Sequence, residues 1–265
     1  MLTSRALVAT STVTVNDVRC VHEPAGWTVP EPVLHQTVVL IRSGLFRRRV
    51  GMREMVLDSS AGYLPLPGTE QAFAHPVGGD RCTSVAVSDE EMSALLGVDG
   101  CPDAAIETTP HIDIAHRALL ARARCGATSD ELAERAHVLV GSVLTGSGQA
   151  CALPGSRTSH RAVDHVRERL AADLSVSLAD LARCAGLSAY HLSRVFRRST
   201  GSTITRYRLR LRLRAALDQL ASGETDLATL AAKTGFSDQA HLTRLLRREI
   251  GHTPGSLRRM FATGG

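Results

Sequence analysis

This sequence has little that would point to a membrane protein or to a common class of enzyme. No apolar run approaches the roughly 18 residues that a helix needs to cross a bilayer. The chain contains neither a glycine-rich phosphate loop nor a Gly-x-Ser-x-Gly nucleophile elbow. We therefore expect a protein that has no membrane partner and is not an enzyme.

The cysteines are scattered along the chain. None of the six cysteines forms a Cys-x-x-Cys pair, which is the spacing typical of structural zinc sites and redox motifs. Residues 1–10 are too weakly apolar, and too poorly followed by a cleavage pattern, to predict a signal peptide. We expect a cytoplasmic protein whose cysteines are free thiols, because disulfides seldom persist in that compartment.

Charge is distributed unevenly along the chain. Residues 1–156 hold 12 arginines against 17 acidic residues, a net charge of −5, whereas residues 157–265 hold 19 basic against 9 acidic residues, a net charge of +10. A basic half of this size favours a polyanionic partner such as nucleic acid. Charge alone would equally suit a solvated basic surface.

The first third of the chain predicts β-structure. Between about residues 15 and 88, short apolar or alternating segments are separated by glycine and proline signals. The predicted strands cover residues 37–41, 45–50, 53–57, 61–66 and 82–87, with a hairpin turn at Gly51-Met52. Short strands at this spacing are typical of a sandwich or a small barrel.

Helices are predicted from residue 88 onward. Ser88 and Glu91 form a capping box that opens a short helix. Two longer helices are predicted over residues 110–124 and 130–144, with Thr109 and Ser129 as their N-caps.

A change in composition marks the domain boundary. Residues 141–157 are rich in glycine and serine, which is typical of a linker, and helical patterns resume near Ser159. We therefore predict an α+β protein with an N-terminal β-domain and flanking helices over residues 1–147, a linker over 148–158 and an all-α domain over 159–265.

The all-α segment carries one pattern twice. Six residues of the first copy recur 49 residues later: Leu178, Ala179, Leu181, Ala182, Gly186 and Ser188. Seven more recur 50 residues later: His191, Leu192, Arg194, Arg197, Arg198, Gly201 and Thr203. A fixed period of this size marks a duplicated supersecondary unit, and the second copy has one extra residue that we place after its serine.

Each copy predicts two helices joined by a tight turn. Ser177 and Ser188 are expected to cap the helices of the first copy, Gly186 to allow its turn, and Ser237 to cap the last helix of the second copy. In each copy, apolar residues three and four apart bury one face of the last helix: Leu192, Val195 and Phe196, then Leu242, Leu245 and Leu246. The opposite faces carry the residues expected to contact DNA: Ala189, Tyr190, Ser193, Arg194, Arg197 and Arg198, then Asp238, Gln239, Ala240, Thr243, Arg244, Arg247 and Arg248.

The chemistry of these faces suits duplex DNA. In a recognition helix the N-terminal residues reach base edges, and basic residues meet phosphates. An arginine can bind guanine, and a glutamine adenine, through two hydrogen bonds. Arg198 and Arg248 are expected on phosphates. A helical bundle that is merely basic would not require two copies to agree in caps, glycines and exposed arginines.

A long helix is predicted between the copies, over residues 203–221. Its alternating arginines cannot share one helical face, so some should be solvated or ion-paired: Arg206, Arg208, Arg210, Arg212 and Arg214. Thr253-Pro254 predicts the start of a closing helix.

Residues 161–259 resemble the DNA-binding domain of the AraC family of transcription regulators. The matching motifs are Leu178-Ala-Asp-Leu-Ala, Gly186-Leu-Ser, His191-Leu-Ser-Arg-Val-Phe, Arg210-Leu-Arg-Leu-Arg-Ala, Gly235-Phe-Ser-Asp-Gln, His241-Leu-Thr-Arg and Gly251-His-Thr-Pro. The resemblance implies two helix-turn-helix units that read successive major grooves of double-stranded DNA. It places base-reading positions at Tyr190, Ser193, Arg194, Gln239, Ala240 and Arg244. Leu246 stands where the family usually has phenylalanine, which should alter packing only.

The N-terminal part resembles, less specifically, the cupin-like sensor domain of the same family. That resemblance implies a β-barrel that binds a small-molecule effector, and helices, here over residues 110–145, that form a homodimer. Metal-dependent cupins share a His-x-His motif, which is absent here, so a cupin enzyme is not expected. His22, His35 and His75 stand alone, and an isolated histidine is more often structural than a ligand.

The N-terminal cysteines leave an alternative open. Cys20 and His22 share one face of a predicted strand, and Cys82 lies on another strand. If the sheet brings them together, they could bind Zn²⁺, or Cys20 and Cys82 could form a redox pair. Buried structural thiols are the commoner role of free cysteine.

These patterns together predict a sequence-specific DNA-binding transcription regulator, an activator under the control of an effector sensed in the N-terminal domain. Its expected partners are double-stranded DNA, a second copy of the chain and RNA polymerase. A metal- or redox-responsive regulator is the alternative. An architectural DNA binder that senses nothing would be favoured if deletion of residues 1–156 left regulation intact.

Overall fold

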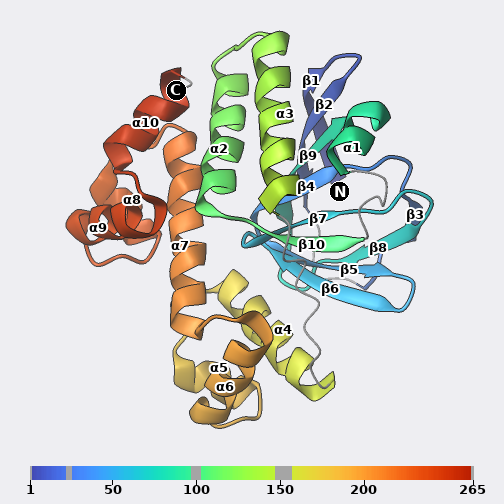
Figure 1. The fold of residues 1–265 in the computed structure, drawn as a ribbon. Helices are drawn as coiled ribbons and strands as arrows, with labels where there is room; N and C mark the ends of the chain where they lie inside the picture. Colours follow the sequence, from blue (N-terminus) through green and yellow to red (C-terminus); the bar gives the residue numbers. More distant parts are fainter. Residues whose placement is uncertain (1, 22–25, 97–102, 147–156, 264–265) are drawn as a thin grey trace.

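The computed structural model describes residues 2–21, 26–96, 103–146 and 157–263 (Figure 1). The strands are β1 (Leu2–Ala9), β2 (Val13–Cys20), β3 (Glu31–Pro32), β4 (Val38–Ser43), β5 (Leu45–Val50), β6 (Arg53–Asp58), β7 (Ala61–Leu64), β8 (Glu70–Ala74), β9 (Asp80–Val87) and β10 (Ala104–Glu107). The helices are α1 (Asp89–Leu96), α2 (Pro110–Arg124), α3 (Ser129–Gly146), α4 (Arg157–Ala172), α5 (Leu178–Cys184), α6 (Ala189–Thr200), α7 (Ile204–Ala221), α8 (Leu227–Lys233), α9 (Gln239–Ile250) and α10 (Pro254–Thr263).

Two antiparallel sheets pack face to face in the N-terminal half. One has the strand order β1-β2-β9-β4-β7-β10 and the other the order β3-β8-β5-β6. Side chains from both sheets fill the space between them: Val39, Ile41, Phe46, Leu57, Tyr63 and Cys82. Helix α3 lies against the other face of the larger sheet (Figure 1), where Val15, Val85 and Leu139 are completely buried. The predicted α+β fold, with an N-terminal β-domain, flanking helices and an all-α C-terminal half, is confirmed, whereas the likeness of the β-domain to cupins stays a prediction.

The predicted hairpin is present, but β1, β3, β8 and β10 escape prediction. Val50 pairs with Arg53 across the turn, and Gly51 there has a φ of 55°. Strand β1 lies at a sheet edge with mostly exposed side chains, so its sequence does not alternate clearly. Strand β3 has only two residues, and β8 and β10 each contain a single large apolar residue, Phe73 and Ile106, so none of them gives a periodic signal.

Most predicted helix starts are confirmed. The Ser88 hydroxyl accepts a hydrogen bond from the backbone N of Glu91, whose carboxylate accepts one from the backbone N of Ser88, both at 3.3 Å. Thr109 caps α2. The prediction that Ser129 caps α3 is wrong, because Thr128 Oγ1 accepts from the backbone N of Glu131 at 3.3 Å and Ser129 is the first helical residue. Among the described helices, none is both long and apolar enough to traverse a bilayer.

Helices occupy both ends of the glycine- and serine-rich stretch, residues 141–157, that resembles a linker in sequence. Residues 141–146 continue α3, because the completely buried Val140 and Val143 anchor this stretch against the sheet and outweigh its glycines. At the other end, Arg157 and Thr158 already belong to α4. The remaining predicted linker residues, 148–156, lie outside the described part of the chain, and the domain boundaries themselves stay a prediction.

The C-terminal half is arranged along α7, with α4 to α6 at one end and α8 to α10 at the other (Figure 1). Helix α2 packs against α7 and α10, and its Ile114, Ala118 and Ala121 join the apolar cluster that also includes residues of α8 and α9. The opposite face of α2 packs against α3. Helix α2 thus contacts its own chain on both of these faces, whereas α3 exposes Val138, and dimerisation through the two helices stays a prediction.

Polar contacts also join the two halves. Arg214 Nε of α7 lies 2.9 Å from Asp113 Oδ2 of α2. Arg167 Nε of α4 lies 2.8 Å from Asp58 Oδ2 at the end of β6. Buried charge as well as apolar contact therefore connects the β-domain and its helices to the C-terminal half.

A buried histidine in α2 predicts pH-dependent stability. The ring of His116 is completely buried, and its Nε2 lies 2.7 Å from Thr83 Oγ1. Burial, followed by the charges of Arg117 and Arg42, lowers the pKa of His116 well below its ordinary value of 6.5. The unfolded chain therefore binds a proton near pH 6.5 that the folded protein does not. The stability contributed by neutral His116 is present above that pH and is lost as the pH falls below it.

We expect the urea midpoint of the wild-type protein to fall between about pH 7.5 and pH 5.5, and the His116→Gln variant to show a smaller fall. His111 lies exposed at the start of the same helix, so His111→Gln is a matched control that should follow the wild type. Equal falls in both variants would mean that another group governs the acid response.

Candidate nucleic-acid interface

The first helix pair, α5 and α6, has the predicted caps. Ser177 Oγ accepts a hydrogen bond from the backbone N of Asp180 at 3.1 Å, and Ser188 Oγ accepts one from the backbone N of His191 at 3.2 Å. Between the helices Gly186 has a φ of 65°, a conformation that favours glycine. The pair is therefore a helix-turn-helix unit whose α6 begins at an exposed, capped N-terminus.

The second helix pair, α8 and α9, repeats this arrangement with one change. Gly235 makes the turn with a φ of 79°, but α9 is capped by Asp238, whose Oδ1 accepts from the backbone N of His241 at 2.7 Å. The prediction that Ser237 caps this helix is wrong: the extra residue precedes the cap, so that Asp238, 50 residues after Ser188, takes its place. Asp238 was expected to face DNA, and its carboxylate instead satisfies the helix N-terminus.

Both second helices bury and expose the same faces. Four side chains are completely buried: Leu192, Phe196, Leu242 and Leu246. Most of the predicted DNA-facing residues are exposed: Ala189, Tyr190, Arg194, Arg197, Arg198, Asp238, Gln239, Ala240, Arg244, Arg247 and Arg248. Ser193 and Thr243 are half-buried. The arginine-bearing sides of both units are thus on the surface and not in the interior.

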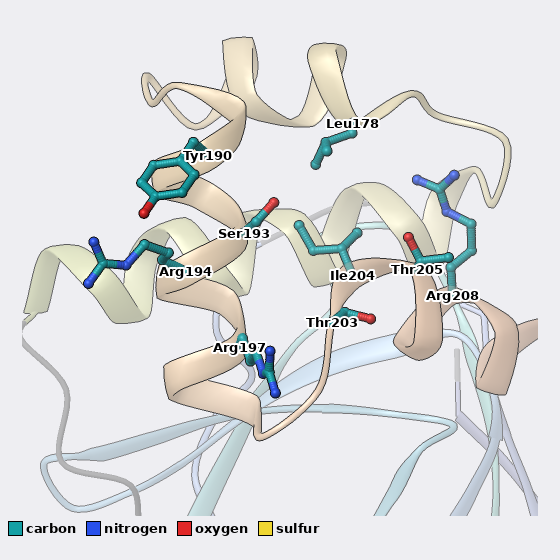
Figure 2. A pocket seen from close by; sticks show the side chains of 9 residues that line it. All are labelled: Leu178, Tyr190, Ser193, Arg194, Arg197, Thr203, Ile204, Thr205 and Arg208. Atoms are coloured by element: carbon teal, nitrogen blue, oxygen red, sulfur yellow. The ribbon is translucent and has the colours of Figure 1, made fainter.

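A cleft of about 300 Å³ opens between α6 and the start of α7 (Figure 2). Its lining is basic and rich in hydroxyl groups: Leu178, Tyr190, Ser193, Arg194, Arg197, Thr203, Ile204, Thr205 and Arg208. Arg194 and Arg197 come from α6, whereas Arg208 comes from α7 (Figure 2). Guanidinium and hydroxyl donors in one cleft are suited to phosphate oxygens.

The repeat extends past each recognition helix into the helix that follows. Arg208 Nη2 of α7 donates to the backbone O of Val176 at 2.5 Å. Arg258 Nη1 of α10, which is 50 residues later, donates to the backbone O of Thr225 at 3.1 Å. Each arginine ties its helix to the segment just before its own unit, so the two units share this anchor as well.

The starts of α7 and α10 were not among the residues predicted to contact DNA. Thr203 Oγ1 accepts from the backbone N of Arg206, and Thr253 Oγ1 from that of Ser256, both at 3.2 Å. Thr203 and Thr205 line the cleft beside α6. The recurrence of Thr203 after 50 residues was an available signal for this position, whereas Thr205 is not repeated.

Some of the exposed side chains have partners within the unit. The Arg194 guanidinium carbon lies 5.7 Å from the centroid of the Tyr190 ring. Ser193 Oγ donates to a backbone carbonyl one turn earlier, at 2.8 Å. Arg248 Nε lies 2.7 Å from Glu249 Oε1, in an exposed ion pair. Exposed pairs contribute little, so Arg248 can exchange this partner for a phosphate at small cost.

The prediction for the α7 arginines is confirmed. Arg210 Nη1 lies 2.8 Å from Glu107 Oε1, and Arg212 Nη2 donates to the backbone O of Leu174 at 3.0 Å. Arg214 is buried and ion-paired with α2. These three side chains therefore hold α7 to its neighbours and do not form part of the exposed basic surface.

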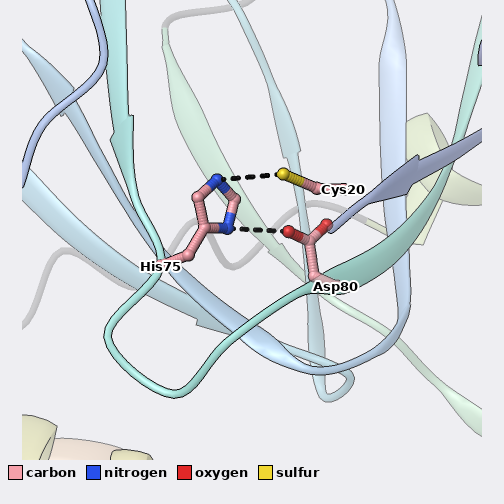
Figure 3. Close-up of side chains that lie close together, drawn as sticks. All are labelled: Cys20, His75 and Asp80. Carbon is pink, nitrogen blue, oxygen red and sulfur yellow. Dashed lines mark hydrogen bonds and ion pairs between the residues drawn. The ribbon is translucent and has the colours of Figure 1, made fainter. Parts of the chain in front are cut away.

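The predicted metal candidates are only partly brought together. Cys20 and Cys82 are buried thiols that are not joined in a disulfide, while His22 lies outside the described residues. Cys20 Sγ lies 3.4 Å from His75 Nε2 (Figure 3), and Cys82 Sγ donates to Asp80 Oδ2 at 3.0 Å. Burial first, and then the charge of Asp80, raises the pKa of both thiols. His75, which the sequence reasoning treated as isolated, takes the place expected for His22.

Comparison with known proteins places the C-terminal half among helix-turn-helix regulators. A family model described as a helix-turn-helix domain matches residues 181–260. The probable transcription factor PqrA of Proteus vulgaris is 30% identical over 83 residues, which are 31% of this chain and 68% of PqrA. The transcriptional regulator GlxA of Rhizobium meliloti is 36% identical over 104 residues, which are 38% of this chain and 32% of GlxA. Further matches include proteins named transcriptional activators.

The likeness outside this region is weaker. The chain spans no more than about a third of the length of the first curated relatives that it matches. Fatty-acid-bound ToxT from Vibrio cholerae aligns with 97% of this chain and 98% of its own, at 11% identity and a TM-score of 0.38. That score is too low for the likeness to bear on the fold or the function of this chain.

Proposed function

This chain belongs to the AraC family of transcription regulators, and we propose that it regulates transcription by reading two successive major grooves of double-stranded DNA with α6 and α9. The observation that carries the proposal is the duplicated unit, in which the same basic face is exposed in both copies. Relatives named transcriptional activators support activation as its result, with RNA polymerase as the second partner.

We further propose which side chains read bases and which bind the backbone. Near the exposed N-termini of the recognition helices, the base readers are Tyr190, Ser193, Arg194, Gln239, Ala240 and Arg244. Farther along each helix, four arginines bind phosphates: Arg197, Arg198, Arg247 and Arg248. Thr203, Thr205 and Arg208 extend the phosphate-binding surface at the first unit, because they line the same cleft.

The N-terminal half would supply control. We propose that the β-domain, residues 1–147, binds a small-molecule effector in the cytoplasm and that residues 159–265 respond. Helix α2 supports this coupling, because its Ile114 and Ala118 belong to the apolar cluster beneath the second helix-turn-helix unit. For a homodimer, the exposed side of α3 around Val138 is the candidate surface.

Substitution of the two arginine readers tests the assignment. Arg194→Ala and Arg244→Ala should each weaken binding to the best DNA site by about 1–3 kcal/mol and relax base preference at one position, because each removes a two-donor contact to a base. Gel-shift titration on a site selected from random DNA gives both quantities.

A matched control is Arg53→Ala, which removes an exposed positive charge from β6, a strand that contributes no residue to the basic face. It should leave the affinity within twofold of the wild type, as estimated for a distant exposed charge at physiological salt. If either reader variant binds its best site as the wild type does, with unchanged base preference, the assignment of that residue fails.

A further inference from the structure

One buried cluster in the β-domain takes no part in the proposed DNA binding. Cys20 Sγ lies 3.4 Å from His75 Nε2, and His75 Nδ1 lies 2.9 Å from Asp80 Oδ1 (Figure 3). One ligand atom from each of the three residues lies within 4.8 Å of the other two. We propose that Cys20, His75 and Asp80 form a binding site for a zinc ion inside the β-domain.

The fold brings these residues together from distant parts of the chain. Cys20 is the last residue of β2 and pairs directly with Asp80, the first residue of β9. His75 follows β8 at the other end of the turn that leads into β9. The cluster thus lies where the chain passes from the smaller sheet to the larger one.

Two glycines allow the strands to approach this closely. A Cβ at Gly79 would lie 2.1 Å from the backbone O of Cys20, and one at Gly44 would lie 2.6 Å from the backbone O of Gly79 and 2.8 Å from the Cα of Asp80. Any larger residue at Gly79 would push the β2 end away from Asp80. Glycine is needed where two backbones come this close, and here it allows the Cys20 thiol and the Asp80 carboxylate to lie near each other.

The spacing and the chemistry of the donors fit zinc. Zn²⁺ binds cysteine sulfur at about 2.3 Å and histidine nitrogen at about 2.0–2.1 Å, so a tetrahedral ion separates the two ligand atoms by about 3.5 Å. The observed distance from Cys20 Sγ to His75 Nε2 is 3.4 Å. Thiolate and imidazole are ligand types that zinc takes from proteins. Asp80 Oδ1 lies 2.9 Å from the other ring nitrogen, Nδ1, so the carboxylate holds the imidazole in place from outside the ion.

Charge balance points in the same direction. All three residues are buried, at 5%, 8% and 5% exposure for Cys20, His75 and Asp80. A thiolate beside a carboxylate is costly there without a cation. A divalent ion compensates both negative charges and leaves His75 neutral, so binding releases the thiol proton and produces a site with no net charge.

The same order of thiol, imidazole and carboxylate is found in catalytic sites in which a cysteine is the nucleophile. A nucleophile must be reached by the group that it attacks, and the 5% exposure of Cys20 gives an organic electrophile no approach. A metal ion needs only the space between the thiol and Nε2 of His75. Burial therefore favours metal binding over covalent chemistry at this sulfur.

Titration of the full-length protein tests the site. After metal removal with a chelator under a phosphine reductant, the wild type should bind one Co²⁺ per chain with a thiolate-to-cobalt absorption band, and Zn²⁺ should displace it. Cys20→Ala should abolish the band. His75→Ala and Asp80→Asn should weaken Zn²⁺ binding at least about tenfold in competition with a chromophoric chelator.

Cys125→Ala and Cys184→Ala are matched controls, because both thiols are exposed and free; each should bind as the wild type does. Thermal unfolding gives a second measurement: Zn²⁺ should raise the Tm of the wild type and of both controls but not that of Cys20→Ala. The proposal is overturned if the wild type shows neither band nor Tm shift, or if the band survives in Cys20→Ala. Loss of the band in a control variant overturns it as well. None of these readouts involves DNA, so failure here leaves the proposed DNA binding untouched.

Discussion

Replacement of Asp113 by alanine is expected to lower the free energy of unfolding by about 3–5 kcal/mol, because it leaves two buried guanidinium groups without their shared carboxylate. Asp113 Oδ1 accepts from Arg117 Nη1 at 3.2 Å, and Oδ2 lies 2.9 Å from Arg214 Nε. The three side chains are 1–5% exposed, so water can replace the lost partner of neither arginine. Urea unfolding near neutral pH, followed by far-UV circular dichroism, measures the change.

The control for this prediction removes the same charge from the surface. Glu134→Ala on α3 takes away an exposed carboxylate and should change stability by less than about 0.5 kcal/mol. If Asp113→Ala also changes stability by less than about 1 kcal/mol, the buried contact between α2 and α7 does not hold the two halves together as the geometry indicates.

The helix-turn-helix units were the most predictable part of the molecule, because their signals are local. A cap needs only one polar side chain beside two or three backbone N–H groups, and a turn needs only one glycine with positive φ. Ser177, Ser188 and Gly186 were therefore identified from sequence. The one error, Ser237 in place of Asp238, arose because two adjacent residues can both cap and an insertion lies beside them.

The Cys20–His75–Asp80 cluster was not predictable in the same way. Cys20 and His75 are 55 residues apart, and their meeting depends on the pairing of β2 with β9 and on the position of β8. Strand β8 escaped prediction because Phe73 is its only large apolar residue. Without it, His75 had no neighbour in the pattern, and His22 was the nearest histidine to Cys20 along the chain.

The position of α2 was also beyond local reasoning. Its buried residues include Ile112, Ile114, Leu119 and Leu120, which lie on more than one side of the helix. Such a pattern predicts burial but not the identity of the neighbour. The choice between a second copy of the chain and the C-terminal half depends on α7, whose contacts lie about a hundred residues away in sequence.

Replacement of Asp58 by alanine should likewise destabilise the protein by about 3 kcal/mol, and it should do so through the contact between the β-domain and the first helix-turn-helix unit. Asp58 ends β6 and is 1% exposed. Its carboxylate accepts hydrogen bonds from Arg167 of α4, at 2.8 Å, and from the hydroxyl of Tyr207 of α7. Removing it leaves the Arg167 guanidinium, whose Nε lies 3.0 Å from the Tyr207 hydroxyl, without its carboxylate.

Protonation of Asp58 at low pH should weaken the same contact, because it removes the charge of the carboxylate but leaves the side chain in place. Burial alone would raise the pKa of Asp58, but the charge of Arg167 and hydrogen bonds from Ser60 and Tyr207 outweigh burial and lower the pKa from 3.8 to about 2. The stability that this carboxylate contributes is therefore fully present above pH 3.8 and is lost as the pH falls through about 2, a total of about 2 kcal/mol.

The isosteric variant Asp58→Asn isolates that contribution. The difference in unfolding free energy between the wild type and Asp58→Asn should be constant above about pH 5 and should shrink by about 2 kcal/mol toward pH 2. Asp130→Asn, at an exposed position in α3, should show no such convergence. A difference that stays constant down to pH 2 would show that Asp58 is not held ionised by Arg167, and the coupling of β6 to α4 would then have to depend on apolar contacts alone.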